Sequence, residues 1–120
     1  MPETSQQSTN FAPVTEAGEL DELLARSHDE PVVLFKHSTT CPISARAHGQ
    51  MKQLSNEVAA QISLLVVQRA RELSRRVAES TGIRHESPQA IILRHGQAVW
   101  SASHFDITTE AVEQAVRENA

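Results

Sequence analysis

The sequence predicts an α/β domain in which a mixed central sheet is flanked by helices. Apolar runs of strand length alternate with segments whose apolar residues recur at helical spacing, an order typical of strand–helix–strand units with parallel strands. Late in the chain, two short apolar runs are separated only by His95-Gly96, which predicts an antiparallel hairpin. Because parallel and antiparallel pairs are both expected, the sheet should be mixed.

One domain accounts for the length of 120 residues, which suffices for a single core and is too short for two. Residues 1–10 are polar and are expected to form an N-terminal tail. Residues 11–120 are expected to form the single domain. Since aromatic residues make up only 3% of the chain, its core must consist mainly of Val, Leu, Ile and Ala.

The strands are predicted from short apolar runs. Residues 32–35 form a continuous β-branched and aromatic run, typical of a central strand covered on both faces. Residues 62–67 predict a second buried strand, parallel to the first because a helix lies between them. The remaining strands are expected over 11–14, 89–94 and 97–101.

Helical spacing of apolar residues predicts four helices, over 16–27, 42–58, 72–81 and 109–118. Gly82 predicts a left-handed C-cap for the third helix, and Thr108 predicts an N-cap for the last. The face of the second helix that should pack on the sheet carries Ile43, Ala47, Met51, Leu54 and Val58.

The only cysteine, Cys41, lies between the strand at 32–35 and the helix expected to begin at Pro42. Proline suits the first helical turn because it lacks an N–H group, so Cys41 is expected to be the N-cap. There the unpaired backbone N–H groups and the helix dipole stabilise a thiolate, the nucleophilic form. The alternative is that Cys41 is a small buried apolar residue, but its setting favours a redox site.

Ser44 occupies the position of the second cysteine in a C-x-x-C motif. Because the chain has no second thiol, any disulfide chemistry must pass through a mixed disulfide with another molecule. We expect Ser44 either to stabilise the Cys41 thiolate, through its hydroxyl or through the N–H of its own turn, or to have no role.

Three strings in this order resemble the YtxJ-like, monothiol bacilliredoxin family of the thioredoxin-like superfamily: KHSTTCPIS at 36–44, HESPQ at 85–89, and Trp100 followed by Ser103-His104. The resemblance implies a thioredoxin-like fold over nearly the whole chain, with a cis bond at Ser87-Pro88 beside Cys41. It also implies that Cys41 attacks a protein–bacillithiol mixed disulfide, frees the client thiol and carries bacillithiol until a second thiol removes it.

On this resemblance Cys41 is the catalytic residue, and substrate contacts are expected from Thr40, Pro42, Ser44, Ser87 and Pro88. The backbone N–H and C=O of Ser87 are expected to bond a client peptide, or the amide groups of the thiol, as a short antiparallel strand. Bacillithiol is implied as co-substrate, with no bound cofactor and no metal. The partners implied are S-bacillithiolated client proteins, and a monomer is expected.

Composition disfavours nucleic acid and membranes as partners. The isoelectric point is near 5.8 and the aromatic residues that stack on bases are scarce. No apolar run approaches the roughly 18 residues of a membrane span, and the polar N-terminus does not read as a signal peptide. With one unpaired cysteine, these features predict a cytoplasmic protein.

Several basic residues have two readings. Lys36 and His37 are expected either to hold the carboxylates of bacillithiol or, more simply, to form a solvated strand end. Surface or capping positions are expected for His48, His85, His95 and His104, and His104 lines the site if the family match extends to it. A solvated helix face is expected for the densest basic cluster, Arg69, Arg71, Arg75 and Arg76.

Two other functions fit parts of the sequence. Cys41 and Ser44 have the spacing of the CGFS motif of monothiol glutaredoxins, which favours iron–sulfur cluster carriage. Cluster ligation needs four thiolates, so a dimer and two free thiols would be required, and a brown colour after anaerobic purification would support it. A non-catalytic thioredoxin-like interaction domain would instead show slow alkylation of Cys41.

Overall fold

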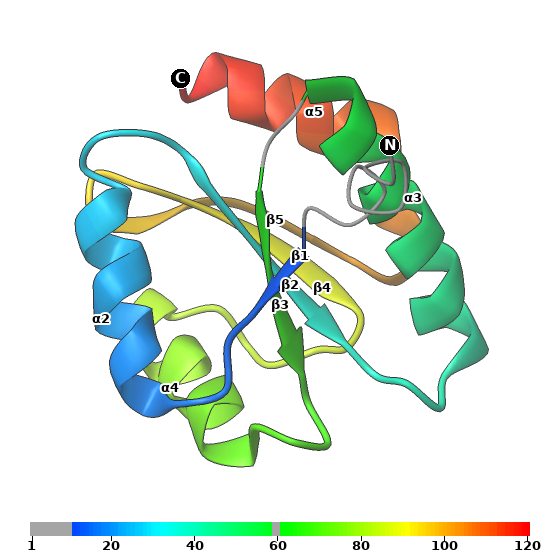
Figure 1. The fold of residues 1–120 in the computed structure, drawn as a ribbon, viewed down its shortest axis with the longest axis horizontal. Coiled ribbons are helices and arrows are strands. Elements are labelled where there is room, and N and C mark those ends of the chain that lie inside the picture. Colours follow the sequence, from blue (N-terminus) through cyan, green and yellow to red (C-terminus); the bar gives the residue numbers. More distant parts are fainter. Residues whose placement is uncertain (1–10, 59–60) are drawn as a thin grey trace, which may run out of the picture.

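The computed structural model describes residues 11–58 and 61–120, which form a central sheet between two layers of helices (Figure 1). The predicted tail at 1–10 and the side chain of Val58 lie outside the described residues. The strands are β1 (Phe11–Pro13), β2 (Val32–His37), β3 (Ile62–Val66), β4 (Gln89–Arg94) and β5 (Gln97–Ser103). The helices are α2 (Ala17–Arg26), α3 (Pro42–Val58), α4 (Arg71–Thr81) and α5 (Thr109–Glu118), with a 3-10 turn η1 (His104–Asp106) before α5.

The sheet is mixed, as predicted, with the strand order β1-β3-β2-β4-β5. Strand β3 pairs in parallel with both β1 and β2, so α3 is the crossover between two parallel strands. Strand β4 is antiparallel to β2 and to β5. In the β4–β5 hairpin, His95 (φ 59°) and Gly96 (φ 78°) are both left-handed, the conformation of a type I′ turn.

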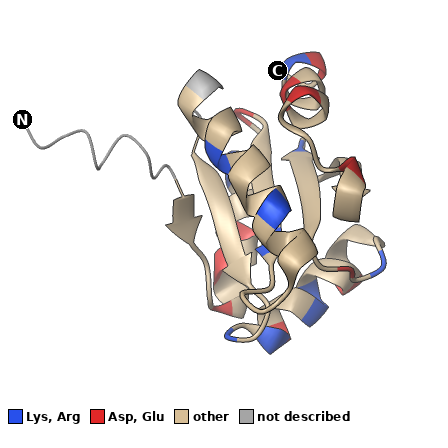
Figure 2. Ribbon diagram, turned by 90° about the vertical axis from the view of Figure 1, so that its right-hand side faces the viewer, with Lys and Arg blue, Asp and Glu red and all other residues tan. Residues whose placement is uncertain are grey.

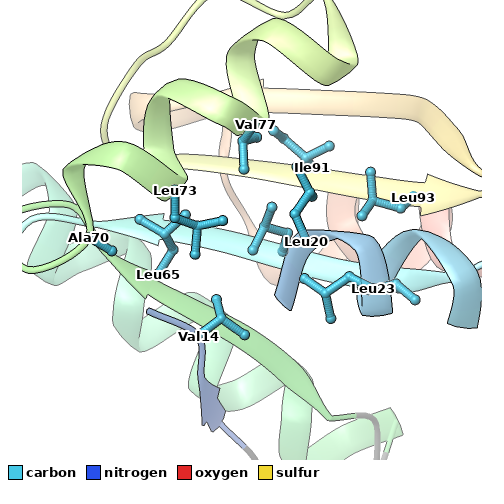
Figure 3. Close-up of a cluster of buried hydrophobic side chains, with 11 residues drawn as sticks. Val14, Leu20, Leu23, Leu65, Ala70, Leu73, Val77, Ile91 and Leu93 are labelled. Carbon is cyan, nitrogen blue, oxygen red and sulfur yellow. The ribbon is translucent and has the colours of Figure 1, made fainter. Parts of the chain in front are cut away.

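Two apolar clusters hold the layers together. Figure 3 shows one of them, in which Leu20 of α2 and Leu73 and Val77 of α4 meet Leu65 and Ile91 of the sheet. Helices α3 and α5 cover the opposite face around a second cluster (Figure 1). Successive residues of β2 contribute to opposite clusters, and residues 32–35 are all buried. The run at 32–35 is therefore a central strand covered on both faces, as predicted.

Strand β2 continues two residues beyond the apolar run, through Lys36 and His37. Lys36 pairs with Leu65 on one side and with Gln89 on the other, and it is 0% exposed. The expectation that Lys36 forms a solvated strand end is therefore wrong. The physical reason is that β2 is central at this point, with a neighbouring strand on each side and helices over its faces.

The helix ends follow the local signals in the sequence. Helix α3 begins at Pro42, and Ala47, Met51 and Leu54 on its predicted inner face are buried. Gly82 is the left-handed C-cap of α4, with φ 74°. The N-cap of α5 is Thr108, as predicted.

The cap of α5 gives a prediction for stability. The Thr108 side chain accepts a hydrogen bond from the Ala111 N–H at 3.1 Å. We expect Thr108→Ala to lower the free energy of unfolding by about 1 kcal/mol, because that N–H loses its partner. Urea denaturation measures the change, with Thr15→Ala, at an exposed position, as the control. Equal stability of the two variants would contradict the capping role.

Candidate redox site at Cys41

Cys41 lies immediately before α3. Its carbonyl accepts a hydrogen bond from the Ala45 N–H at 3.0 Å, and its own N–H donates to the Ser38 carbonyl at 3.4 Å. Cys41 is therefore the N-cap of α3, as predicted. The residue is partly exposed, so it is not the enclosed apolar side chain of the alternative reading. Neighbouring Thr40 and Pro42 are exposed beside it.

The loop before Cys41 is held by Gln68, which follows the end of β3. The Gln68 side-chain oxygen accepts from the Thr39 N–H at 3.3 Å. Its Nε2 donates to Ser38 Oγ at 3.0 Å and to Thr40 Oγ1 at 3.2 Å. One side chain thus contacts all three residues that precede the cysteine. Sequence reasoning missed Gln68, although parallel β2 and β3 end at the same edge of the sheet, where loops meet.

Ser44 is fully buried in the first turn of α3. Its Oγ accepts a hydrogen bond from the Ser38 N–H at 2.9 Å and lies 2.8 Å from His37 Nδ1, with which it shares a second bond. Ser44 therefore joins the start of α3 to the end of β2, a structural role that the sequence did not indicate. Its stabilisation of the Cys41 thiolate stays a prediction.

Two histidines pack against this junction. The ring centroids of His37 and His48 are 4.8 Å apart, and His48 lies 4.7 Å from the ring of Phe11. Burial lowers the pKa of both histidines, with a further lowering of the His37 pKa by the charge of His48 and of the His48 pKa by Lys52. Both imidazoles are therefore neutral near pH 7. His48 is half-buried among rings, which corrects the expected surface or capping position.

The peptide bond between Ser87 and Pro88 is cis, as the resemblance implies. The β4 ladder begins at Gln89, which pairs with Lys36 next to the end of β2. Ser87 and Pro88 therefore lie at the sheet edge from which the Cys41 loop also departs. The Ser87 hydroxyl is enclosed and has no hydrogen-bond partner among the described residues.

His104, directly after β5, contacts the segment at 85–89 that carries the cis-proline. Its backbone N–H donates to the Pro88 carbonyl at 3.1 Å, and its φ is 54°. His104 Nδ1 lies 3.8 Å from the Glu86 carboxylate, and its side chain is 48% exposed. Trp100 is half-buried against the cluster under α3 and α5, so it packs as a strand residue, as expected.

Lys36 lies beneath the proline segment. Its Nζ donates to Gln89 Oε1 at 3.2 Å, and Gln89 Nε2 donates to the Arg84 carbonyl at 3.0 Å. Burial lowers the pKa of Lys36 to about 8, and the carboxylate of Glu86 opposes this shift. Lys36 is thus a buried amine with a pKa of about 8, close to the proline segment of the site. The apolar pattern of the sequence did not indicate it.

The two hydrogen bonds of Ser44 give a second prediction for stability. We expect Ser44→Ala to lower the free energy of unfolding by about 1–3 kcal/mol, because the Ser38 N–H and the His37 ring lose a buried partner. Thiol exchange should be largely retained, since Cys41 is unchanged. Urea denaturation and an exchange assay check both parts, with Ser80→Ala, at an exposed position of α4, as control. Unchanged stability would contradict the structural role.

A cysteine that caps the helix after a central strand, with a cis-proline segment at the same sheet edge, defines a protein of the thioredoxin class with a thiol redox role. A solved structure described as an oxidoreductase with a thioredoxin fold matches with a TM-score of 0.81 and 33% identity, over 88% of this chain and 92% of that one. The family model of the monothiol bacilliredoxin BrxC matches residues 12–112. The chain belongs to the monothiol bacilliredoxin family.

More distant structures share the fold alone. Thioredoxin from Schistosoma mansoni matches with a TM-score of 0.73 and 19% identity, over 95% of this chain and 98% of that one. Thioredoxin from Fasciola hepatica matches with a TM-score of 0.72 and 12% identity, over 90% of this chain and 98% of that one. The thioredoxin-like fold predicted from the sequence is therefore confirmed.

Two features are absent from the part of the chain that the structure describes. Within residues 11–58 and 61–120, no three His, Cys, Asp or Glu side chains are grouped as metal ligands would be. None of the helices in these ranges has the length and apolar character needed to cross a membrane.

Proposed function

We propose that the protein removes bacillithiol from protein mixed disulfides, with Cys41 as its one nucleophile. The observation that carries the proposal is the position of Cys41, which is the only cysteine of the chain and is partly exposed at the N-terminus of α3. Membership of the monothiol bacilliredoxin family supports bacillithiol as the thiol.

The reaction consists of two thiol–disulfide exchanges. The Cys41 thiolate attacks the bacillithiol sulfur of the mixed disulfide, the bond to the client sulfur breaks, and the client leaves as a thiolate that takes a proton from water. Cys41 now carries bacillithiol as a disulfide. A second bacillithiol thiolate attacks the bacillithiol sulfur of this adduct, which releases bacillithiol disulfide and restores the Cys41 thiolate. One disulfide is consumed and one is formed in each exchange.

The remaining site residues position the reactants. Gln68 and Ser44 hold the loop that presents Cys41, through hydrogen bonds to residues 38–40. Ser87 lies just outside the β4 ladder, and this position supports the proposal that its backbone pairs with an extended client segment. Thr40 and Pro42 flank the cysteine and provide the nearest exposed surface for the substrate.

Intact-mass spectrometry tests this function. The protein is mixed with a client that carries bacillithiol on one cysteine, and both masses are followed in time. We expect the client to lose one bacillithiol while the protein gains one on Cys41, and we expect the glutathione mixed disulfide of the same client to react more slowly. Client release without any adduct on Cys41, or release by protein alkylated at Cys41 beforehand, would contradict the proposal.

A further inference from the structure

A cavity of about 310 Å³ adjoins the Cys41 loop. Its volume falls at the lower end of the range of small-molecule sites. The cavity lies between the end of β3, the first turns of α4 and the segment that leads to Pro88, and it is lined by Val67, Gln68, Arg71, Ser74, Arg75, Ala78 and His85.

Gln68 connects this cavity to the redox site. The same side chain that lines the cavity makes the hydrogen bonds to Ser38, Thr39 and Thr40. Gln68 thus lines the cavity and also braces the loop before Cys41, which Ser44 holds as well. Gln68 is therefore the structural link between the cavity and the loop that carries Cys41.

The cavity lining is mostly apolar and contains two arginines. Arg71 and Arg75 come from α4, which lies at the end of the molecule where basic segments are seen in Figure 2. Arg75 is already paired with Glu79 at 3.0 Å and lies 3.7 Å from Glu72. Among the described residues, Arg71 has no carboxylate within ion-pair distance. Its guanidinium is therefore available to an anionic ligand.

Lys36 adds a buried positive charge behind this lining. His85, which lines the cavity and shares a 3.0 Å hydrogen bond with Ser74, has a pKa lowered first by burial and then by the Lys36 ammonium, with Glu86 opposing. The ammonium is thus close enough to act on a cavity residue. Glu86, whose carboxylate acts on both Lys36 and His85, lies 3.8 Å from Arg84 and from His104.

We propose that this cavity binds the carboxylate-bearing part of the low-molecular-weight thiol while its sulfur is at Cys41, with Arg71 as the main contact. The inference rests on the proposed function and extends it, because it assigns the acidic part of the thiol to a place in the fold. An arginine presents a planar pair of N–H donors that matches a carboxylate. All three arginines Arg69, Arg71 and Arg75 are exposed, but only Arg71 and Arg75 line the cavity.

The kinetic test uses one client protein carrying either bacillithiol, which has carboxylates, or cysteamine, which has none. For Arg71→Gln we expect kcat/KM to fall about tenfold with the bacillithiol substrate, the loss of roughly one charge-assisted hydrogen bond, and to change less than about twofold with the cysteamine substrate. The matched control is Arg69→Gln, for which both rates should stay within about twofold of wild type. An equal loss with both substrates in Arg71→Gln, or no loss with either, would overturn the subsite.

A binding measurement separates the subsite from the catalytic proposal. Cys41→Ser protein is titrated with reduced bacillithiol, and the backbone amide signals of Gln68, Arg71 and His85 are followed by NMR. We expect these signals to shift, and Arg71→Gln in the same background should weaken the titration about tenfold. Shifts without turnover by the wild type would retain the subsite and remove the proposed function. Turnover without shifts at these residues would retain the function and overturn the subsite.

Discussion

Cys41→Ser is expected to reduce the release of bacillithiol from a client to the rate of the reaction without protein. The sequence contains no other thiol, and a serine hydroxyl does not exchange with disulfides. Following the client by intact mass under single-turnover conditions measures the loss. Substantial release by the variant would place the reaction outside Cys41.

Measuring the stability of Cys41→Ser shows whether the variant keeps the wild-type fold. The hydrogen bonds of Cys41 in the loop and helix are made by its backbone N–H and carbonyl, and serine is a preferred N-cap residue. We therefore expect the free energy of unfolding to stay within about 0.5 kcal/mol of wild type or to rise slightly. A loss of stability together with activity would show that the substitution acts through the fold.

Replacing the buried lysine is expected to change how stability depends on pH. The pKa of Lys36 in the folded protein is about 8, against an ordinary value of 10.5 that applies to the unfolded chain. Between these values the unfolded chain binds more protons than the folded protein, so the wild-type free energy of unfolding rises with pH. Lys36 contributes roughly 3 kcal/mol to this rise. The contribution is present in full above pH 10.5, the pKa in the unfolded chain, and it is lost as the pH falls through about 8, the pKa in the folded protein.

Lys36→Met removes this contribution. We expect the stability of the variant relative to wild type to fall by roughly 3 kcal/mol between pH 7 and pH 10.5, in urea denaturation at a series of pH values. Taking the difference at each pH cancels the other titrating groups. Lys52→Met, at an exposed position of α3, is the control and should differ from wild type by a constant amount. Parallel curves for Lys36→Met and wild type would show that the ammonium is not desolvated.

The apolar pattern predicted the layers of this protein well because each strand and helix packs one or two faces on a core. Residues 32–35 are buried on both faces, and the inner face of α3 was identified from helical spacing. The same pattern ended β2 too early. Apolar periodicity gives no signal where a polar side chain is buried by its neighbours in the sheet, which is the case for Lys36.

The sequence by itself determined that one thiol caps a helix after a central strand, since Cys41, Pro42 and the run before them are local signals. Only the tertiary structure decided which residues surround that thiol. Gln68 bonds to the loop across up to 30 positions, and Lys36 bonds to Gln89 across 53. Such pairs depend on strand order and register, and the cavity at Arg71 depends on how α4 packs. The surroundings of Cys41 therefore depend on contacts between segments that are distant in the chain, and local sequence patterns do not encode such contacts.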